Sequence, residues 1–535
     1  MHVQVQVQVH VQVQVQVPAR RLVLLTPAAV AAVVVFLLAT LPPAAVRISL
    51  EEVDAGLRGR TLAGAYHIHT IRSDGAGTRA AVAAAAARAG LAYAVFADHG
   101  DGTRPVDPPA YLDGVLCIDA VEISTNGGHY VAIGLPVAPY PLGGDASAVV
   151  EDVSRLGGFG IAAHPDHPKA ELAWTDWSAP IDGLEWINAD SEWRNESPLA
   201  LARVLFDYLL RPGPALASVF DRPERTLARW DAMSRDRRVT ALAAVDAHGG
   251  GGGSPRDDES RPVVGPSYEA SFRTLSNRVV LERAPTGDAA GDAELVLDAI
   301  RRGAVYSVVD AISPDVILAA GEAGFDARSP LPPGAQVVTV GDAERRRLEI
   351  HMPGAPGDPR MPWVLTNWTG PARRPAAVAA QPAADAATPM AVGNWRVEKD
   401  EASSGQVSSS QDAMTLQYRL QGGGRQSQFV AAVTDLSETT AFSGILFRAR
   451  AARPMRVSVQ LRFAPGDRRW VKSVYVGPED REIRVAVGEM APAERAGGRM
   501  PAAETARSLL LVVDLVNAKP GDEGSFTIAD LRVAR

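Results

Sequence analysis

Between residues 65 and 310, short apolar runs alternate with longer segments in which apolar residues recur at helical spacing. Short apolar runs bounded by polar or turn residues are typical of buried strands, and the longer segments are typical of amphipathic helices. The pattern predicts seven strands: Ala65–His69, Ala92–Ala97, Val115–Glu122, His129–Leu135, Gly160–His164, Gly183–Asn188 and Thr240–Asp246.

Helices are predicted between several of these strands, and such alternation indicates an α/β sheet whose strands are largely parallel. Seven or so units in about 250 residues suit a β/α barrel, and an open doubly wound sheet is the alternative. The predicted helices include Thr78–Ala89, Ala146–Leu156, Glu224–Arg235 and Ala293–Arg302.

The pattern changes after the predicted barrel. Residues 313–370 have short β runs and many prolines, so we expect a small β segment there. Residues 371–391 are rich in alanine and proline, as linkers are. Residues 392–535 alternate like strands between turns, which indicates an antiparallel sandwich. The expected strands are Met414–Leu420, Phe429–Leu436, Gly444–Arg450, Met455–Phe463, Trp470–Val476, Glu482–Met490, Ser508–Val516 and Ser525–Val533.

The N-terminal part has two segments of unusual composition. Residues 1–17 are a low-complexity Val-Gln tract, to which we assign no function. Within residues 18–46, no charge occurs after Arg20 and Arg21, and basic residues before an apolar run are typical of a signal peptide or a membrane anchor. A buried Ala/Val-rich helix is the alternative. Because the arginines should stay in the cytoplasm, we expect everything after residue 46 to lie outside it.

Composition narrows the function classes. At 535 residues, 46% of them apolar, the chain is long enough for two or three domains. Its net charge is −8 and no Lys/Arg-rich block stands out, which argues against a nucleic-acid partner. The single cysteine, Cys117, lies in an apolar run, so disulfides and cysteine-based zinc fingers are excluded.

Histidines and acidic residues gather in short motifs between residues 67 and 248. Neutral imidazole and ionised carboxylate bind divalent cations well, so the motifs predict a metal centre. Most of these residues stand at or just beyond the C-terminal end of a predicted strand, the rim at which β/α barrels carry their active sites. The nine candidate ligands are His67, His69, Asp74, His99, Glu122, His129, His164, Asp246 and His248.

The spacing within the motifs supports shared ligation. His67 and His69 are two residues apart, and on a strand such positions face the same way. Glu122 ends a very apolar strand, and its buried carboxylate needs a partner, either two cations that it bridges or an arginine. His129 instead opens its strand, so either this strand runs in the other sense or its predicted start is displaced by a few residues.

Charge arithmetic favours several ions. The three carboxylates of Asp74, Glu122 and Asp246 contribute −3 and six neutral imidazoles contribute nothing, so three divalent cations would leave about +3. That charge suits a phosphate dianion together with a hydroxide. Divalent cations also lower the pKa of bound water to about 7, which supplies a nucleophile at neutral pH.

Five motifs, read in order, resemble those of the PHP (polymerase and histidinol phosphatase) family: HIHTIRSDGAGT, FADHG, AVEISTNGGHYVAIGL, IAAHPDHP and AAVDAHGG. The resemblance covers residues 60–310. It implies a distorted (β/α)7 barrel with a phosphoesterase centre of two or three divalent ions, zinc, manganese or iron. Val245 departs from the family, which often has serine before the aspartate.

Carried over by position, the resemblance implies three ion sites, and every expected ligand position is filled. We also expect His99 and Asp246 to take part in the chemistry. The first site would be held by His67, His69, Glu122 and Asp246, the second by Glu122, His129 and His164, and the third by Asp74, His99 and His248.

Other side chains are candidates for supporting roles. Arg72, Lys169 and Arg194 follow strand ends or lie in motif loops, where they could hold phosphate oxygens, and plain surface solvation is the alternative for each. Asp98 precedes His99 and could orient a ligating imidazole or cap a helix.

The C-terminal sandwich is similar to galactose-binding-like jelly rolls of the carbohydrate-binding-module kind, a resemblance carried by LLLVVDLVNAKPGDEGSFTIADLRV. It implies that this part could bind sugar. Trp395 and Trp470 could stack on sugar rings, although tryptophans of such sandwiches are more often part of the core.

These observations lead to one hypothesis and two alternatives. The chain is expected to be an exported phosphoesterase, membrane-tethered if the N-terminal segment is uncleaved, that hydrolyses a small-molecule or glycan phosphate ester with a metal-activated hydroxide. One alternative is an amidohydrolase-like metallohydrolase acting on another bond. The other is a non-catalytic glycan-binding envelope protein in which the metals are structural.

Overall fold

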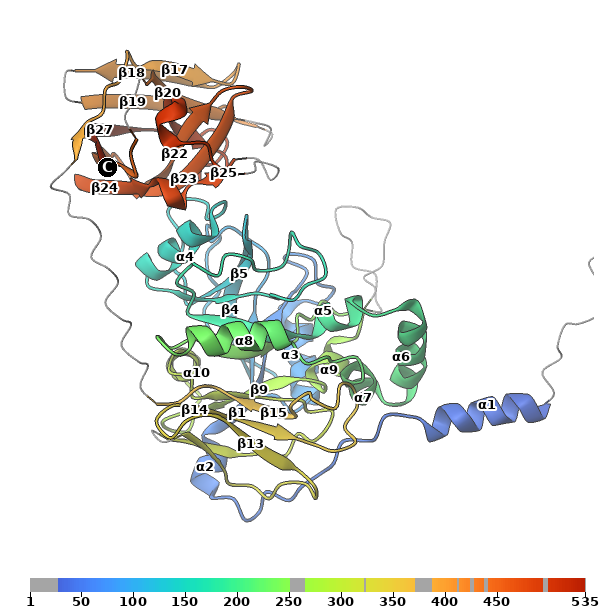
Figure 1. The fold of residues 1–535 in the computed structure, drawn as a ribbon. Helices are drawn as coiled ribbons and strands as arrows, with labels where there is room; N and C mark the ends of the chain where they lie inside the picture. Colours follow the sequence, from blue (N-terminus) through green and yellow to red (C-terminus); the bar gives the residue numbers. More distant parts are fainter. Residues whose placement is uncertain are drawn as a thin grey trace, which may run out of the picture. The chain divides into compact units, whose positions relative to one another are not determined.

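A mixed sheet of 13 strands forms the larger part of the protein (Figure 1). The computed structural model describes residues 27–250, 265–321, 324–370, 387–410, 413–423, 428–436, 441–493 and 499–534. The Val-Gln tract and most of the predicted linker lie outside these residues.

The chain divides into two units, residues 1–42 and 43–535. In the first, α1 (Pro27–Ala39) is a short apolar helix, and its Val35 and Phe36 side chains are each 64% exposed. Among the residues that the structure describes, no helix combines the length and the apolar character needed to cross a membrane. The predicted span starts at Leu22, before these residues.

Seven strands of the large sheet were predicted from the apolar runs, and six of them, all except β7, carry or directly precede the motifs. Their hydrogen-bonding order is β1-β2-β4-β5-β6-β7-β8. The end of β8 returns to β1, because Val245 N donates to Tyr66 O at 3.1 Å and His69 N donates to Ala247 O at 3.0 Å. The strands are β1 (Thr61–Ile68), β2 (Tyr93–Phe96), β4 (Val115–Thr125), β5 (Gly128–Ile133), β6 (Phe159–Ala162), β7 (Gly183–Asn188) and β8 (Thr240–Ala244).

The expected regular strand–helix repeat is only partly present. β5 is antiparallel to both β4 and β6, whereas the β1–β2, β2–β4, β6–β7 and β7–β8 pairs are parallel. Asn126 and Gly127 are the only residues between β4 and β5, too few for the crossover that a parallel pair requires. Of the two explanations for His129 at the start of a strand, the structure favours reversed direction.

Helices follow several strands and begin at polar caps. The side chains of Thr78, Asp145, Ser197 and Asp288 accept backbone N–H groups at the starts of α3, α4, α6 and α10. With Asp288 as its cap, α10 begins at Ala289, four residues before the predicted start at Ala293. The helices of this unit are α2 (Ala55–Gly59), α3 (Arg79–Arg88), α4 (Ala146–Arg155), α5 (Ala189–Arg194), α6 (Pro198–Leu210), α7 (Pro212–Ala217), α8 (Glu224–Met233), α9 (Tyr268–Phe272) and α10 (Ala289–Arg301).

Two glycines of the sheet make room for aromatic rings on neighbouring strands. A Cβ on Gly64 would lie 2.3 Å from the Tyr93 ring, and one on Gly160 would lie 2.2 Å from the Tyr130 ring. Both tyrosines are buried. Each glycine contributes no side chain to the core, and the space this leaves is filled by the tyrosine ring of the neighbouring strand.

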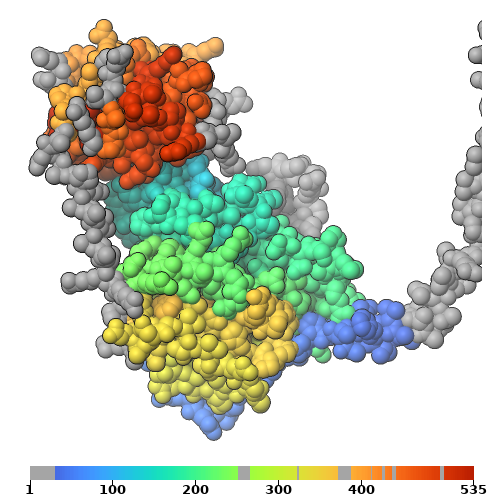
Figure 2. Space-filling model, in the orientation of Figure 1, coloured from blue at the N-terminus to red at the C-terminus, as the bar shows by residue number. Residues whose placement is uncertain are grey.

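The large sheet continues beyond β1 through antiparallel strands. The predicted small β segment is therefore joined to the barrel sheet through the β10–β15 pair. β13 is an exposed edge strand, within the yellow part of the surface in Figure 2. The strands of this extension are β9 (Ser276–Val280), β10 (Val305–Val308), β13 (Gln336–Gly341), β14 (Arg346–His351) and β15 (Val364–Thr366), beside β3 (Ala110–Leu112) and the separate pair β11 (Leu318–Gly321) and β12 (Gly324–Ala327).

The C-terminal part has two six-stranded sheets, and all eight predicted strands are present. Trp470 is 2% exposed and packs edge-on against Phe463, so it belongs to the core. The strands are β16 (Thr388–Pro389), β17 (Arg396–Lys399), β18 (Ser404–Ser409), β19 (Ala413–Arg419), β20 (Phe429–Asp435), β21 (Gly444–Ala451), β22 (Met455–Phe463), β23 (Arg468–Val476), β24 (Arg481–Ala486), β25 (Ala491–Pro492), β26 (Ala506–Asp514) and β27 (Glu523–Ala534).

Candidate metal centre

The nine side chains singled out from the motifs come together in space. Five groups of three among them place one nitrogen or oxygen atom per residue within 4.8 Å of the others. The groups are His67–His69–Glu122, His67–His164–Asp246, His69–Asp74–His99, His69–Asp246–His248 and His99–Glu122–His129.

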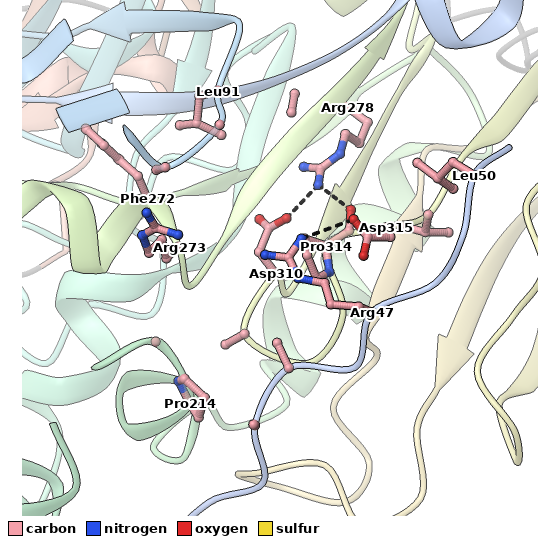
Figure 3. A pocket seen from close by; sticks show the side chains of 18 of the residues that line it. Arg47, Leu50, Leu91, Pro214, Phe272, Arg273, Arg278, Asp310, Pro314 and Asp315 are labelled. Atoms are coloured by element: carbon pink, nitrogen blue, oxygen red, sulfur yellow. Dashed lines mark hydrogen bonds and ion pairs between the residues drawn. The ribbon is translucent and has the colours of Figure 1, made fainter. Parts of the chain in front are cut away.

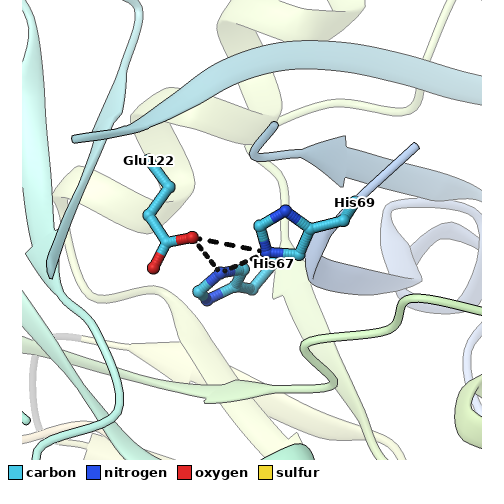
Figure 4. A group of neighbouring side chains, drawn as sticks. All are labelled: His67, His69 and Glu122. Atoms are coloured by element: carbon cyan, nitrogen blue, oxygen red, sulfur yellow. Dashed lines mark hydrogen bonds and ion pairs between the residues drawn. The ribbon is translucent and has the colours of Figure 1, made fainter. Parts of the chain in front are cut away.

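Glu122 lies between two sets of imidazoles. Its Oε1 is 2.8 Å from Nδ1 of His129 and 2.9 Å from Nε2 of His164. Its Oε2 is 3.3 Å from Nε2 of His67 and 3.4 Å from Nε2 of His69, as Figure 4 shows, and 3.1 Å from Nδ1 of His99. The two oxygens of one carboxylate thus face different histidines, which is the arrangement that a bridging ligand needs.

Three of the nine residues have backbone conformations that side chains rarely adopt. His67, His164 and Asp246 have φ angles of 67°, 31° and 44°. Each stands at or beyond the end of a strand, and the pairing of β1 with β2 shifts register between Tyr66 and Ile68. Left-handed conformations outside glycine cluster at functional sites, where they aim a side chain in a required direction.

One edge of the cluster is open to solvent. The side chains of His99 and Asp74 are 35% and 32% exposed, whereas those of His67 and Glu122 are at most 1% exposed. Asp74 Oδ2 lies 3.4 Å from Nε2 of His248 and 3.7 Å from Nε2 of His99. A substrate can therefore reach the cluster from the side of these three residues.

The electrostatics keep the carboxylates ionised. Burial alone would raise the pKa of Glu122, but the imidazoles of His67, His129 and His164 hold it well below its ordinary value. Burial also opposes ionisation of Asp246. The neighbouring histidines, above all His67, nevertheless hold the pKa of Asp246 well below the usual range. Anionic carboxylates are the form that a divalent cation requires.

The imidazoles respond in the opposite sense. Burial lowers the pKa of His248, but the carboxylates of Asp74 and Asp246 raise it to about 9. Burial likewise opposes protonation of His67, while Asp246, Glu185 and Glu122 raise its pKa well above the ordinary value. Negative charge therefore dominates the interior of the cluster.

The donor set fits divalent cations. Among the residues that the structure describes, none donates a hydrogen bond to the buried Asp246 Oδ1, yet this oxygen lies 3.5, 3.2 and 3.8 Å from nitrogens of His67, His69 and His248. A cation among these atoms would satisfy that oxygen. Imidazole nitrogens and carboxylate oxygens without thiolates suit zinc, manganese or iron.

Asp98 supports the cluster by a route that the sequence did not predict. Its carboxylate accepts the backbone N–H and the hydroxyl of Thr70 at 2.7 and 2.8 Å, and the hydroxyl of Ser73 at 2.8 Å. It therefore holds the loop between His69 and Asp74. Because the Ser73 hydroxyl also lies 3.3 Å from Nδ1 of His69, this contact is compatible with the expected orientation of a ligating imidazole, by way of Ser73.

Two residues on β7 were missed in the sequence. Glu185 is fully buried and lies 2.6 Å from Nδ1 of His67, and Asn188 lies 3.1 Å from Asp246. The apolar run that contains them predicted the strand without marking either residue as functional. A lone carboxylate inside a buried strand, which needs a partner, was the indication available.

The three basic residues predicted to bind phosphate lie in different surroundings. Arg194 pairs with Asp190 beside the cluster; burial lowers its pKa, but Asp190 first, then Asp246 and Asp74, raise it overall. Arg72 pairs with Asp107, and Lys169 is exposed in the loop after β6.

His167 is buried near His164, and its Nδ1 accepts the backbone N–H of Lys169 at 3.0 Å.

A pocket of about 350 Å³ adjoins the cluster. Asp246 and His248 line one side of it, and Trp193, Leu216 and Phe220 supply apolar surface. Its other lining residues are Ala189, Asp190, Arg194, Val245, Ala247, Gly249, Gly250, Gly265, Pro266, Ser271 and Thr274.

Three larger hollows of the described structure, of about 500, 580 and 1030 Å³, contain none of the nine residues. One of about 580 Å³ is lined by arginines and apolar side chains, and Figure 3 shows Arg278 within it bonded to Asp310 and Pro314. Another, of about 1030 Å³, is lined by both polar and apolar residues and lies between loops of the large-sheet part and the sandwich strands β22 and β23.

Comparisons with known proteins give structural likeness alone. No protein-family model matches the chain, and no curated protein matches it. Similar solved structures include a two-domain protein containing a predicted PHP-like metal-dependent phosphoesterase from Bacteroides vulgatus, with 10% identity over 88% of this chain and 99% of that one and a TM-score of 0.28.

Other similar structures are carbohydrate-binding modules. A family 11 module from Clostridium thermocellum, in complex with a β-1,3-1,4-mixed-linked tetrasaccharide, is 14% identical over 28% of this chain and 96% of that one, with a TM-score of 0.23. The family 11 module of a cellulosomal cellulase from the same organism is 16% identical over 27% and 89%, with a TM-score of 0.22. Both kinds of resemblance found in the sequence thus recur among similar structures, but at these scores they assign no activity.

Proposed function

We propose that the protein is an exported, metal-dependent phosphoesterase that hydrolyses a small phosphate ester. The observation that carries the proposal is Glu122, whose two oxygens face separate sets of imidazoles within 3.4 Å. Such a buried donor set has no evident structural purpose without cations, because burying this many polar groups is costly unless they are satisfied.

The nine residues would hold two or three divalent ions, of zinc, manganese or iron. Glu122 would bridge, with His67, His69 and Asp246 on one side and His129 and His164 on the other. Asp74, His99 and His248 would form the open edge. Bound cations of this kind acidify water and neutralise charge on a phosphoryl group.

Residues beside the nine ligands would bind the substrate. In the reaction, an oxygen derived from water forms a bond to phosphorus, the ester P–O bond breaks, and the departing alcohol takes up a proton. Arg194 would hold a phosphate oxygen beside the ions. The pocket lined by Trp193 and Phe220 would receive the alcohol, and its volume of about 350 Å³ favours a compact leaving group such as one sugar or nucleoside unit.

Export is the second part of the proposal. It is supported by the uncharged run from Leu22 to Val46, which follows Arg20 and Arg21. An extracytoplasmic location would exclude cytoplasmic biosynthetic intermediates and favour nucleotides, phosphosugars or phosphorylated envelope glycans as substrates.

The test is hydrolysis by the purified full chain loaded with Mn²⁺, Zn²⁺ or Fe²⁺. We expect release of phosphate from phosphate esters and no turnover of amides or lactones. His69→Ala and Asp246→Ala should each lower the bound metal, measured by elemental analysis, and reduce turnover by about 100-fold or more, because each removes a ligand and leaves buried donors unpaired.

His351→Ala is the matched control, since His351 also contacts a carboxylate, that of Glu349 at 3.1 Å, but lies outside the cluster. It should leave both metal content and turnover unchanged. Full activity in the His69 and Asp246 variants would refute the metal centre, and turnover of amides or lactones alone would favour the amidohydrolase-like alternative.

A second function, carbohydrate binding, is favoured by the hollow beside β22 and β23. Ser458, Gln460 and Arg469 line it from the sandwich and Asn126 and Ser147 from the barrel. Such side chains suit the hydroxyl groups of a glycan. Retardation of the full chain in gels that contain mixed-linked β-glucan, relieved by Gln460→Ala together with Arg469→Ala, would support this function; migration equal to that in glycan-free gels would exclude it for that glycan.

A further inference from the structure

Among the seven strands from β1 to β8 in the sheet order, β7 is the one that neither carries nor directly precedes a motif. β1, β4, β5 and the segments after β1, β2, β6 and β8 supply the nine candidate ligands, whereas β7 supplies none of them. It nevertheless places Glu185 and Asn188 against the cluster. These two residues, named here the β7 pair, are 0% and 4% exposed.

Glu185 contacts two of the candidate ligand residues. Its Oε1 lies 2.6 Å from Nδ1 of the His67 ring. Its Oε2 accepts the backbone N–H of His164 at 2.7 Å and an amide N–H of Asn188 at 2.8 Å. In the described structure Glu185 has no arginine or lysine partner, and its hydrogen bonds go to His67, His164 and Asn188. Burial raises the pKa of Tyr66, and the charge of Glu185 raises it further.

Asn188 contacts a third candidate ligand, Asp246. Its side-chain nitrogen donates to Asp246 Oδ2 at 3.1 Å as well as to Glu185. Its side-chain oxygen accepts the N–H of Ser191 at 3.0 Å and so caps α5. The cap fixes the amide orientation, because an amide whose oxygen accepts from the helix must direct its nitrogen to the carboxylates.

The three residues that the β7 pair touches are those with left-handed backbone conformations. His67, His164 and Asp246 have φ angles of 67°, 31° and 44°, and the other six candidate ligands have none in this region. A strained conformation persists only where surrounding contacts hold it. The coincidence of strain and contact at the same three residues indicates that β7 holds them.

We propose that Glu185 and Asn188 are positioning residues that hold His67, His164 and Asp246 in place for cation binding. The proposal rests on the metal centre proposed above. Glu185 also sets the tautomer of His67: a carboxylate only accepts, so Nδ1 carries the proton and the Nε2 lone pair is directed to the cluster, 3.3 Å from Glu122 Oε2.

Glu185→Gln tests the tautomer with almost no change in shape. The glutamine amide can donate to Nδ1, which moves the ring proton to Nε2 and blocks that ligand atom. We expect affinity of the full chain for Mn²⁺, measured by competition with a chelating dye, to fall by about 10- to 100-fold. The visible absorption of the Co²⁺-loaded variant should also change, because one nitrogen ligand is lost.

Asn188→Ser tests the second residue. Serine retains the ability to cap α5 but is too short to reach Glu185 and Asp246. Mn²⁺ affinity should therefore fall by a smaller factor than in Glu185→Gln, while the helix content measured by circular dichroism stays at its original value.

The control is Glu349→Gln, which alters another buried glutamate, bound to Arg222 at 2.8 Å and to Arg347 at 2.6 Å. It should lower the thermal midpoint of the metal-free chain and leave Mn²⁺ affinity and the Co²⁺ spectrum unchanged, which separates a positioning role from a merely structural one.

The outcomes distinguish this proposal from the proposed function. Unaltered Mn²⁺ affinity and Co²⁺ spectrum in Glu185→Gln would overturn the positioning role and leave the phosphoesterase intact. Weakened binding in the variant of a chain that hydrolyses no phosphate ester would uphold the positioning role and remove the phosphoesterase. If the original chain binds no divalent cation, both are overturned.

Discussion

Arg194 and Arg72 show how the surroundings of a single residue determine what it can bind. Arg72 is held by Asp107 and faces the acidic group of Asp107 and Asp119. Arg194 is instead held by Asp190, lies over the Trp193 ring at 4.7 Å and lines the pocket beside the cluster. We therefore expect Arg194, rather than Arg72, to contact the substrate of the proposed phosphoesterase.

Arg194→Ala should reduce kcat/KM for a phosphate ester by about tenfold or more, because it removes a charged hydrogen-bond donor from the substrate. Initial-rate kinetics check this, and bound metal should stay at its original level. Arg302→Ala is matched, since Arg302 forms an i,i+4 pair with Asp298 on α10. Equal kinetics for both variants would show that Arg194 does not touch the substrate.

The sequence located the nine clustered residues but not the β7 pair. The nine stand in short motifs of histidine and acid, most of them at or just beyond a strand end, and the spacing of these motifs together with their resemblance to a known family marked them. Glu185 stands alone among apolar residues, and its role depends on which ring lies opposite it. That partner, His67, is 118 positions away, and no local pattern connects the two.

At the scale of elements, the β4–β5 hairpin controls where His129 points. Gly128 has a φ angle of 109°, and a Cβ on it would lie 2.5 Å from the carbonyl oxygen of Ala173. Only glycine permits this approach. It brings the start of β5 against the loop between β6 and β7, which contains Ala173, and places His129 beside Glu122.

Gly128→Ala should lower the free energy of unfolding by about 3 kcal/mol, through backbone strain and the clash together. Urea denaturation measures this, and Mn²⁺ affinity should fall because His129 is displaced. Gly114→Ala is the comparison, because Gly114 has a φ angle of 79° but open space around its Cβ position. It should cost only about 1–2 kcal/mol and leave affinity unchanged; an equal cost in both would exclude the clash.

Element types followed from the sequence more closely than their directions did. The seven strands predicted for the barrel and the eight predicted for the sandwich are present, with bounds that differ by a few residues. Strand direction was not specified by that pattern, because alternation reports burial and not pairing. The two-residue connection between β4 and β5 decided it.

At the scale of the molecule, Arg456 of β22 joins the sandwich to α4 of the barrel part. The guanidinium is 3% exposed and donates to Asp152 at 2.7 and 2.9 Å, to Glu151 at 2.7 Å and to the carbonyl of Ala148 at 2.9 Å. Burial lowers its pKa, and the two carboxylates more than offset this.

Arg456→Met should lower the free energy of unfolding of the full chain by about 3 kcal/mol, since it leaves buried acceptors on α4 without this donor. Equilibrium unfolding in urea is the measurement. Arg448→Met is the control, because Arg448 on the adjacent sheet forms an exposed pair with Asp480 and should leave stability unchanged. If Arg456→Met is also neutral, the contact does not join the two parts.

The sequence by itself determined the element types and the identities of nine residues with metal-binding chemistry, because both depend on local pattern: burial periodicity in one case and motif spacing in the other. Only the tertiary structure decided the reversed direction of β5, the junction of β15 with β10, and the contacts of Glu185 and Asn188. Those depend on which distant strands become neighbours, and pairing between residues far apart in the chain leaves no periodicity to read.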